Sequence, residues 1–138
     1  MRRSLEVVAA VIIRGDAVLA CRRKVGKSAA GLWEFPGGKV EGGEPPTSAL
    51  RREIREELAV EIGVSDLLLR RVTQVGDTDI DLACYSSTLV GPLPVASTDH
   101  DLMVWQDISD LGDLEWAAPD LPMVSLLLER NRPGPFLE

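Results

Sequence analysis

Hydrophobic positions along the chain follow two periods, and together they predict a sheet covered by helices. An unbroken, largely β-branched run over residues 7–13 predicts a buried strand. Residues 17–22 predict its hairpin partner after the turn Arg14-Gly15-Asp16. Further strands are predicted over residues 32–35, 60–75 with a break near Ser65-Asp66, 79–90 and 102–105.

One central segment carries apolar residues at helical spacing. The helix is expected to start at Pro45-Pro46-Thr47, where proline suits the first turn and the hydroxyl of Thr47 or Ser48 can cap free N–H groups. It runs to about residue 58, and its apolar stripe consists of Ala49, Leu50, Ile54 and Leu58.

The C-terminal part of the chain is also predicted to be helical. A short helix is predicted over residues 107–111 and a final one over residues 121–130, ended by the stop signal Asn131-Arg132-Pro133-Gly134. Strands combined with two helices that are far apart in the sequence indicate the α/β class. A length of 138 residues indicates a single domain, residues 1–138.

Charge and composition narrow the function classes. The net charge of −7 argues against binding to a nucleic-acid polymer, although metal ions can still make a local site attractive to an anionic substrate. No apolar stretch approaches the roughly 20 residues that cross a bilayer, so no membrane association is expected. The two cysteines, Cys21 and Cys84, lack CxxC spacing and are expected to be reduced thiols in a cytoplasmic protein.

The most informative chemistry lies in the central helix. Glu53, Glu56 and Glu57 are spaced i, i+3 and i+4, so they fall on one stripe. Their mutual repulsion becomes attraction when a hard divalent cation such as Mg²⁺ takes their oxygens as ligands. Glu53 and Glu57 border the apolar stripe and are expected to be half-buried. The alternative interpretation is a solvent-exposed charged face with an ion pair between Arg52 and Glu56.

The loop before this helix favours the metal interpretation. Gly37 and Gly38 permit positive φ angles and a close approach of the backbone to a ligand. Lys39 offers a cation for phosphate, and Glu44 adds a further carboxylate between the loop and the helix. A metal held against phosphate groups is therefore the preferred hypothesis.

Taken together, these positions resemble the Nudix box, which reads G-x5-E-x7-R-E-U-x-E-E-x-G-U with U an apolar residue. The matching residues are Gly38, Glu44, Arg52, Glu53, Ile54, Glu56, Glu57 and Val60. Residues 31–39, GLWEFPGGK, are similar to the MutT-type nucleoside triphosphate pyrophosphohydrolases. Within that group, the whole chain is similar to the CTP and 5-methyl-dCTP pyrophosphatase branch.

One position departs from the box, because Ala59 stands where the family has glycine. A glycine there would supply a left-handed helix cap, and forcing another residue into that conformation costs about 1–2 kcal/mol. Either the turn is altered or the strain is tolerated. Since the position contributes no side-chain chemistry, activity is expected to survive.

The resemblance implies the Nudix fold, a mixed β-sheet sandwiched between helices, and a dependence on Mg²⁺, with Mn²⁺ able to substitute. The implied metal ligands are the Gly37 carbonyl, Glu53, Glu56 and Glu57. Glu53 or Glu57 would also be the base that activates water. Arg52 would orient the glutamates, and Glu44 would support the geometry of the loop and helix.

Residues outside the box are also assigned by the resemblance. Arg23 matches a phosphate-binding arginine, which Lys39 could assist. Asp99, with Asp101 as second choice, would add a metal ligand or serve as base, and the alternative is a solvated turn before a strand. His100, the single histidine, is expected to be exposed and incidental, and a zinc site is not expected.

Asp120 is the main indication of base specificity. It follows Pro119 at the start of the last helix, where an aspartate can act as N-cap. The resemblance instead places it at the nucleobase, where a carboxylate can accept the cytosine N4 amino group or N–H donors of guanine. Trp116 is the expected wall of the base pocket, whereas Trp33 and Trp105 lie in strand patterns typical of core residues.

These expectations describe a Mg²⁺-dependent pyrophosphohydrolase that converts a nucleoside triphosphate to the monophosphate and pyrophosphate. The preferred substrates are CTP, dCTP and 5-methyl-dCTP, with 8-oxo-dGTP as the alternative. A non-catalytic nucleotide-sensing module and a protein-interaction domain are alternatives of other classes, and both are disfavoured because the box glutamates are all present. Exposed strand edges suggest a homodimer.

Overall fold

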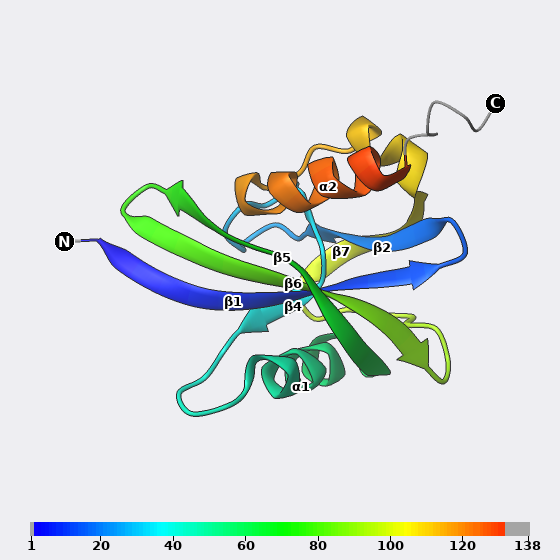
Figure 1. The fold of residues 1–138 in the computed structure, drawn as a ribbon, viewed down its shortest axis with the longest axis horizontal. Coiled ribbons are helices and arrows are strands. Elements are labelled where there is room, and N and C mark those ends of the chain that lie inside the picture. Colours follow the sequence, from blue (N-terminus) through cyan, green and yellow to red (C-terminus); the bar gives the residue numbers. More distant parts are fainter. Residues whose placement is uncertain (1, 132–138) are drawn as a thin grey trace.

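The computed structural model describes residues 2–131, and within that range seven strands form a mixed sheet between two α-helices (Figure 1). The strands are β1 (Arg3–Arg14), β2 (Ala17–Arg23), β3 (Trp33–Glu34), β4 (Gly37–Lys39), β5 (Glu61–Val75), β6 (Thr78–Val90) and β7 (His100–Asp107). The α-helices are α1 (Pro46–Leu58) and α2 (Leu121–Asn131), and the 3-10 helices are η1 (Ile108–Asp113) and η2 (Ala118–Asp120). The predicted α/β class is therefore confirmed.

Strand β1 organises the sheet. The strand order is β3-β2-β1-β6-β5, with β4 paired to β1 and β7 paired to β2. β1 runs parallel to β6 over residues 3–12 and antiparallel to β4 at Val7, Val8 and Ala9. Near its end it pairs with β2 instead, at Ile13 and Arg14. Because β4 lies against the middle of β1, the loop that leads into α1 starts at the centre of the sheet.

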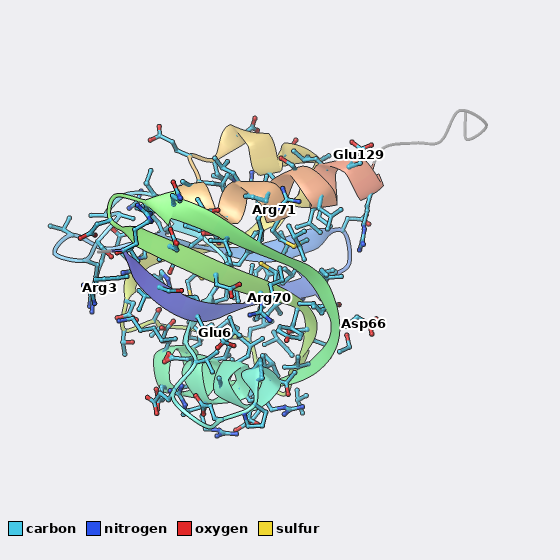
Figure 2. The ribbon with its side chains drawn as sticks, turned by 60° about the vertical axis from the view of Figure 1, so that its left-hand side comes forward. Arg3, Glu6, Asp66, Arg70, Arg71 and Glu129 are labelled. Atoms are coloured by element: carbon cyan, nitrogen blue, oxygen red, sulfur yellow. The ribbon has the colours of Figure 1, made fainter. Side chains whose placement is uncertain are left out.

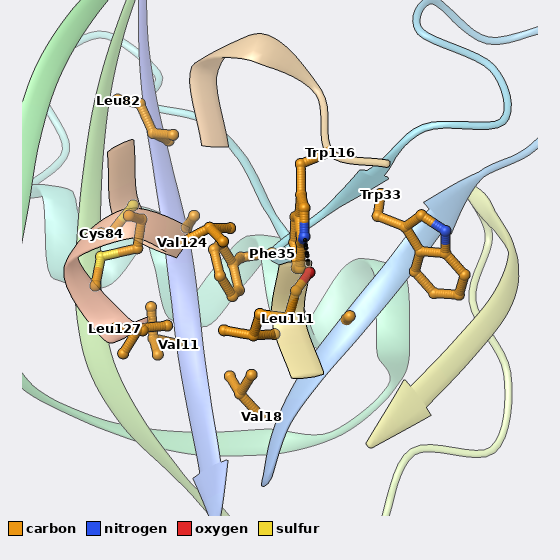
Figure 3. Close-up of a cluster of buried hydrophobic side chains, with 13 residues drawn as sticks. Val11, Val18, Trp33, Phe35, Leu82, Cys84, Leu111, Trp116, Val124 and Leu127 are labelled. Atoms are coloured by element: carbon orange, nitrogen blue, oxygen red, sulfur yellow. Dashed lines mark hydrogen bonds between the residues drawn. The ribbon is translucent and has the colours of Figure 1, made fainter. Parts of the chain in front are cut away.

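Both faces of β1 are buried over residues 8–12, which explains the apolar run there. Val8, Ala10 and Ile12 belong to a core cluster that also contains residues of α1. Ala9 and Val11 point to the opposite face, into a cluster that contains residues of α2. Figure 3 shows this second cluster, in which α2 side chains pack onto the strands. The two helices therefore cover opposite faces of one sheet, as the sequence pattern predicts.

The predicted break within the long fifth strand has a different form in the structure. β5 continues through Ser65 and Asp66, but its register against β6 shifts twice between Val64 and Leu69. The polar interruption therefore marks an irregularity inside one strand. The predicted stop signal after α2 lies mostly outside the described residues, since residues 132–134 are beyond them.

Both ends of α1 are informative. The helix begins after Pro45 with no side-chain cap, so the expected capping by Thr47 or Ser48 does not occur. At the other end, Ala59 has φ 56° and ψ 34°, and its N–H donates to the Arg55 carbonyl at 3.1 Å. Ala59 thus adopts the left-handed turn that a glycine would supply, and the strain of a non-glycine residue is tolerated.

Charged side chains lie on the outer face of β5 and β6, as the labelled Arg70 shows (Figure 2). Arg70 of β5 makes a bidentate ion pair with Asp81 of β6, with N–O distances of 3.0 and 2.8 Å. β5 ends the sheet, and its two register shifts disturb the regular edge that pairing with a second chain requires. The homodimer expected from exposed edges stays a prediction. Among residues 2–131, no helix is long and apolar enough to cross a membrane.

Candidate active site

A cleft of about 980 Å³ brings together most of the residues to which the sequence assigned a chemical role. The predicted residues that line it are Arg23, Gly37, Lys39, Glu53, Glu57, Asp99 and Asp120. The predicted residues outside the lining are Glu44, Arg52, Glu56 and Trp116. Apolar lining comes from β1, β6 and residues 117–119. The cleft thus combines charged groups with apolar surface, which suits a ligand that has an anionic and an apolar part.

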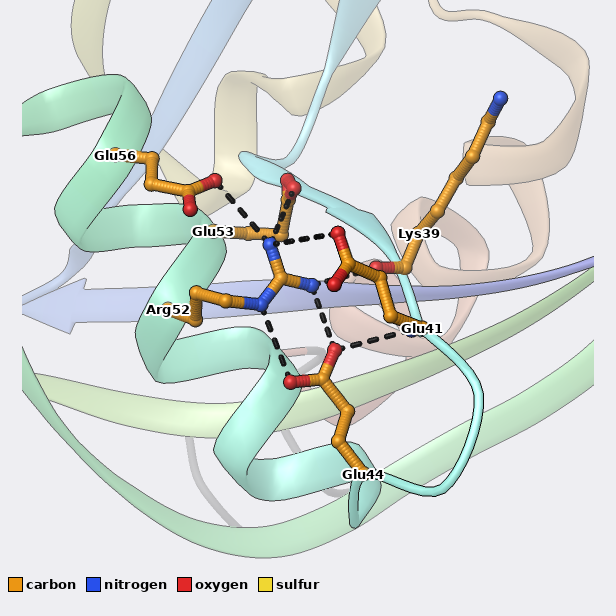
Figure 4. A network of polar contacts seen from close by, with 6 residues as sticks. All are labelled: Lys39, Glu41, Glu44, Arg52, Glu53 and Glu56. Atoms are coloured by element: carbon orange, nitrogen blue, oxygen red, sulfur yellow. Dashed lines mark hydrogen bonds and ion pairs between the residues drawn. The ribbon is translucent and has the colours of Figure 1, made fainter.

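An ion pair between Glu44 and Arg52 ties the glycine loop to α1 (Figure 4). Arg52 Nη2 and Nε donate to the two carboxylate oxygens of Glu44 at 2.6 and 3.1 Å. Glu44 also accepts the N–H of Glu41 at 3.0 Å, and Arg52 Nη2 donates to the Lys39 carbonyl at 3.1 Å. The bonds from Arg52 and then from Glu41 lower the pKa of Glu44. This carboxylate therefore stays ionised and acts by fixing the loop and the guanidinium.

The same guanidinium restrains two glutamates of the acidic stripe. Arg52 Nη1 lies 3.2 Å from Glu53 Oε1 and 3.2 Å from Glu56 Oε2. The Glu53 side chain is 16 % exposed and that of Glu56 is 59 % exposed, so the expected half-burial holds for Glu53. Burial raises the pKa of Glu53, Arg52 opposes this effect, and repulsion from Glu56 and Asp99 adds to it. The Arg52 guanidinium thus offsets part of the electrostatic repulsion between the glutamates of the stripe.

Close packing explains the glycines at positions 37 and 38. A Cβ atom on Gly37 would overlap the backbone of Val8 and Ala9, whereas one on Gly38 would overlap the Glu53 carboxylate. Neither glycine has a positive φ angle. β4 is therefore wedged between β1 and α1, and the absence of side chains lets Glu53 rest directly against the backbone.

Glu57 is the carboxyl group with the least satisfied surroundings. Its Oε2 atom is buried and has no hydrogen-bond partner within residues 2–131. Burial, together with the neighbouring carboxylates of Asp99, Glu53 and Glu34, raises the pKa of Glu57 to about 9. Buried polar atoms without partners are rare in folded proteins, and an ion that satisfies them is one explanation.

Asp99 faces Glu57 from the loop before β7. Partial burial alone would raise the pKa of Asp99, but hydrogen bonding with Glu57 and Lys27 outweighs it and lowers that pKa. Lys27 Nζ lies 3.0 Å from Asp99 Oδ1. The pKa of Glu57 and that of Asp99 are thus shifted in opposite directions, as expected for two carboxyl groups that titrate as a coupled pair. Asp101 is engaged elsewhere, because it accepts a hydrogen bond from Arg22 Nε at 2.8 Å.

The chemistry of these donors fits a hard divalent cation. Glu53, Glu57 and Asp99 present carboxylate oxygens to one cleft, and the unpartnered Glu57 oxygen can take a further ligand bond. Within residues 2–131, no three acidic, histidine or cysteine side chains already converge in a metal-binding arrangement. Two of these carboxylates instead pair with basic side chains, Glu53 with Arg52 and Asp99 with Lys27. A cation would compete with both of these ion pairs.

In the described part of the chain, three basic side chains line the cleft: Arg23, Lys27 and Lys39. Arg23, at the end of β2, is held by hydrogen bonds from Nε to the Ser28 carbonyl at 3.1 Å and from Nη2 to its hydroxyl at 3.3 Å. Lys39 is exposed, and Figure 4 shows its side chain extending away from the Arg52 network. Lys27 was not predicted, because nothing in its loop of small and polar residues distinguishes it from a solvated lysine.

Asp120 lies where the cleft meets the core. Its side chain is buried, and Oδ1 accepts the Phe35 N–H at 3.0 Å instead of capping a helix. Burial raises the pKa of Asp120 well above its usual range, and repulsion from Glu34 contributes in the same direction. A carboxyl group in this environment favours the neutral acid, which can both donate and accept a hydrogen bond.

Trp116 does not wall the cleft, so that prediction is wrong. Its ring stacks on Phe35 with 4.8 Å between centroids, and its indole N–H donates to the Leu111 carbonyl at 2.8 Å. Among residues 2–131, Phe35 is the aromatic residue that lines the cleft, and Trp116 stacks against it from outside the lining. Trp33 is buried as expected.

His100 is buried, which corrects the expectation of an exposed and incidental residue. Its side chain is 0 % exposed, and Nε2 lies 2.8 Å from Glu34 Oε2. Glu34 lines the cleft and was not predicted as a site residue. The sequence did carry a signal, since Glu34 is a charged residue between Trp33 and Phe35 inside a strand pattern.

Comparison with known proteins gives a consistent result. The model of the NUDIX domain matches residues 4–127. A protein of Mycobacterium tuberculosis named "Putative 8-oxo-dGTP diphosphatase 2" is 38 % identical over 117 residues, which are 83 % of this chain and 81 % of that protein. An Escherichia coli CTP pyrophosphohydrolase is 34 % identical over 135 residues, or 96 % of this chain and 98 % of that protein. The solution structure of the E. coli ORF135 protein has a TM-score of 0.77 and 31 % identity, covering 98 % and 96 % of the two chains.

We expect alanine at the two packed glycines to separate folding from metal binding. In Gly37→Ala the new Cβ meets the backbone of β1, so the free energy of unfolding should fall by about 1–3 kcal/mol. In Gly38→Ala it meets the end of the Glu53 side chain, which can swing aside. Stability should then change little, while Mg²⁺ affinity falls roughly 10–100-fold because a proposed ligand is displaced.

Urea unfolding and calorimetric titration with Mg²⁺ or Mn²⁺ measure the two quantities. Gly42→Ala is the matched control, because a Cβ there meets nothing within 4 Å. Equal losses of stability in Gly37→Ala and Gly38→Ala, with metal affinity unchanged in both, would contradict the packing argument.

The raised pKa of Glu57 predicts how stability depends on pH in the metal-free protein. An unfolded glutamate loses its proton near pH 4.3, whereas folded Glu57 keeps it up to about pH 9. The stabilising effect of this proton is therefore complete below about pH 4 and is lost as pH rises towards 9. Glu57→Gln cannot ionise, so at pH 8 it should exceed the wild type in unfolding free energy by on the order of 3 kcal/mol.

Urea unfolding in the presence of a chelator, between pH 5 and 9, provides the measurement. Glu56→Gln serves as control, since Glu56 is exposed and its replacement should leave the pH slope of the wild type in place. A stability difference between Glu57→Gln and wild type that stays constant over this range would show that Glu57 is not held neutral.

Proposed function

Because this chain belongs to the Nudix family, as a hydrolase of the MutT type, we propose that it converts a nucleoside triphosphate to the monophosphate and pyrophosphate. The observation that carries the proposal is the unpartnered buried Glu57 oxygen in a cleft that Glu53 and Asp99 also line. Basic side chains and an apolar wall share the same cleft, so anionic and apolar parts of one ligand can be bound together.

The cation in this proposal is Mg²⁺, with Mn²⁺ as a substitute. The residues that would hold it are the Gly37 carbonyl, Glu53, Glu56, Glu57 and Asp99. Such an ion neutralises phosphate charge and lowers the pKa of bound water. Arg23, Lys27 and Lys39 would bind the phosphate groups and hold the reacting phosphorus in place.

The protein's own groups would perform the remaining steps. Glu53 or Glu57 accepts a proton from the attacking water, and Arg52 restrains the Glu53 carboxylate at 3.2 Å so that it stays aligned. Glu44 acts one step further away, because its bonds to Arg52 keep that guanidinium in place. Arg52 and Glu44 are therefore positioning residues in this scheme.

Asp120 supports a cytosine base. As a neutral acid it offers a hydroxyl donor and a carbonyl acceptor, which match the N3 acceptor and the N4 amino donor of cytosine. We therefore place CTP, dCTP and 5-methyl-dCTP first. The E. coli relative named CTP pyrophosphohydrolase, which matches nearly the whole chain, is in keeping with this choice.

The second candidate substrate is 8-oxo-dGTP. An ionised Asp120 would instead accept the N1–H and N2 amino donors of a guanine ring. The relative from M. tuberculosis, whose name refers to 8-oxo-dGTP, favours this alternative. A nucleotide-sensing module without catalysis is the candidate from another class, and it differs in predicting binding without release of pyrophosphate.

A nucleotide panel tests the activity. We expect purified protein with Mg²⁺ to release pyrophosphate from CTP, dCTP or 5-methyl-dCTP, and Mn²⁺ to support the same reaction. Glu57→Gln should lower kcat at least about 100-fold, since it removes a metal ligand or the base. Binding of nucleotide with no pyrophosphate from any member of the panel, which includes dGTP and 8-oxo-dGTP, would favour the sensing module.

Substitutions at Asp120 test the base assignment. Asparagine also presents one donor and one acceptor, so Asp120→Asn should keep kcat/KM for dCTP within about fivefold, whereas Asp120→Ala should lose roughly 10–100-fold. In the wild type, preference for dCTP over 8-oxo-dGTP should fall as pH rises and the acid ionises, and in Asp120→Asn it should stay constant. If asparagine is as harmful as alanine, the neutral-acid assignment is wrong.

A further inference from the structure

A buried chain of polar side chains leads from the loop before β7 into the cleft. His100 Nε2 lies 2.8 Å from Glu34 Oε2, and His100 Nδ1 lies 2.7 Å from the Ser97 hydroxyl. The three residues come from β7, from β3 and from the loop that precedes β7. The His100 side chain is fully buried, and each of its two ring nitrogens has a hydrogen-bond partner.

The partners fix the roles of the two ring nitrogens. A carboxylate accepts hydrogen bonds, so the Nε2–H of His100 donates to Glu34. In the tautomer that carries its proton on Nε2 alone, Nδ1 accepts a hydrogen bond from the Ser97 hydroxyl at 2.7 Å. Ser97 therefore holds the ring, and the ring holds one oxygen of Glu34.

This leaves the other Glu34 oxygen available to a ligand. Oε2 receives His100 and, at 3.5 Å, Arg23 Nη1. Oε1 makes no hydrogen bond within residues 2–131, and Glu34 lines the cleft. Glu34 is also close enough to Asp120 to affect its ionisation, which places both carboxyl groups in the part of the cleft next to Phe35.

We propose that His100 is a positioning residue for substrate specificity: it aims Glu34 Oε1 at the cytosine amino group or the 2′-hydroxyl of the bound nucleoside. The inference rests on the proposed function. A long acidic side chain that lines a cleft has several rotamers, and the bonds to His100 and Arg23 select one of them. Selecting this rotamer then strengthens binding of the nucleoside, whereas other residues bind the phosphate groups.

The nature of the donor can be resolved by comparing nucleotides. A donor on the sugar, the 2′-hydroxyl, would make CTP sensitive to loss of His100 and leave dCTP unaffected. A donor on the base, the cytosine amino group, would make CTP and dCTP equally sensitive and leave UTP unaffected, because UTP has a carbonyl at that position.

Steady-state kinetics of His100 variants on CTP, dCTP and UTP test the proposal. His100→Leu keeps the volume and removes the donor, so we expect KM to rise about 10-fold or more for the sensitive nucleotides, with kcat within about threefold. His100→Gln carries an amide N–H that can replace Nε2–H, and it should restore KM to within about threefold of wild type. The Mg²⁺ activation constant should be unchanged in both, although Asp99 is the neighbouring residue.

A double-mutant cycle distinguishes positioning from a general structural role. Glu34→Gln should cost about as much as His100→Leu, and the double variant should be no worse than either single variant. If His100→Leu does not fold, the same cycle is run with Ser97→Ala, which removes the support of the ring.

Additive losses, equal losses on all three nucleotides, or failure of glutamine to rescue would overturn the proposal. Wild-type protein that hydrolyses none of these nucleotides would overturn the proposed function as well.

Discussion

The close approach of β4 to β1 on one side and to Glu53 on the other is the constraint on which the site depends. Only glycine fits at position 37, because a side chain would overlap the backbone of β1, and a side chain at position 38 would displace the Glu53 carboxylate. The Glu44–Arg52 pair then fixes the loop between β4 and α1. As a result, the acidic stripe of α1 is pressed against a backbone segment at the centre of the sheet, where it cannot be fully hydrated.

This placement works against the stability of the folded chain. Glu34, Glu53, Glu57 and Asp99 line one cleft, and burial raises the pKa of Glu57 to about 9. Ion pairs with basic side chains offset part of the repulsion, but one buried Glu57 oxygen keeps no partner within residues 2–131. Departures of this kind from good local chemistry are typical of functional sites, where a ligand supplies the missing interaction. The strained turn at Ala59 lies at the end of the same helix.

The sequence was most informative where the relevant contacts are local. The apolar stripe and the acidic stripe of α1 follow from spacing along one helix, and the burial of Glu53 followed from their adjacency. It was misleading at His100 and Trp116, whose surroundings come from distant segments. Residues 115–117 lie beside β3 through a bridge between Trp33 and Trp116, which buries the indole and leaves Phe35 at the cleft. Pairing of β7 with β2 similarly brings His100 beside Arg23 and Glu34.

The sequence by itself determined the class of fold, the central helix with its carboxylates, and the family, because the box is continuous and its spacing is read directly from the chain. Only the tertiary structure decided which backbone atoms exclude a side chain at each glycine, which aromatic ring lines the cleft, and that Asp120 and Glu34 meet there. The physical reason is that the cleft is lined by residues of the strands β1 to β6, of α1 and η2, and of the loops that connect them. Burial and ionisation in such a place depend on how these segments pack, and periodicity within any one of them does not contain that information.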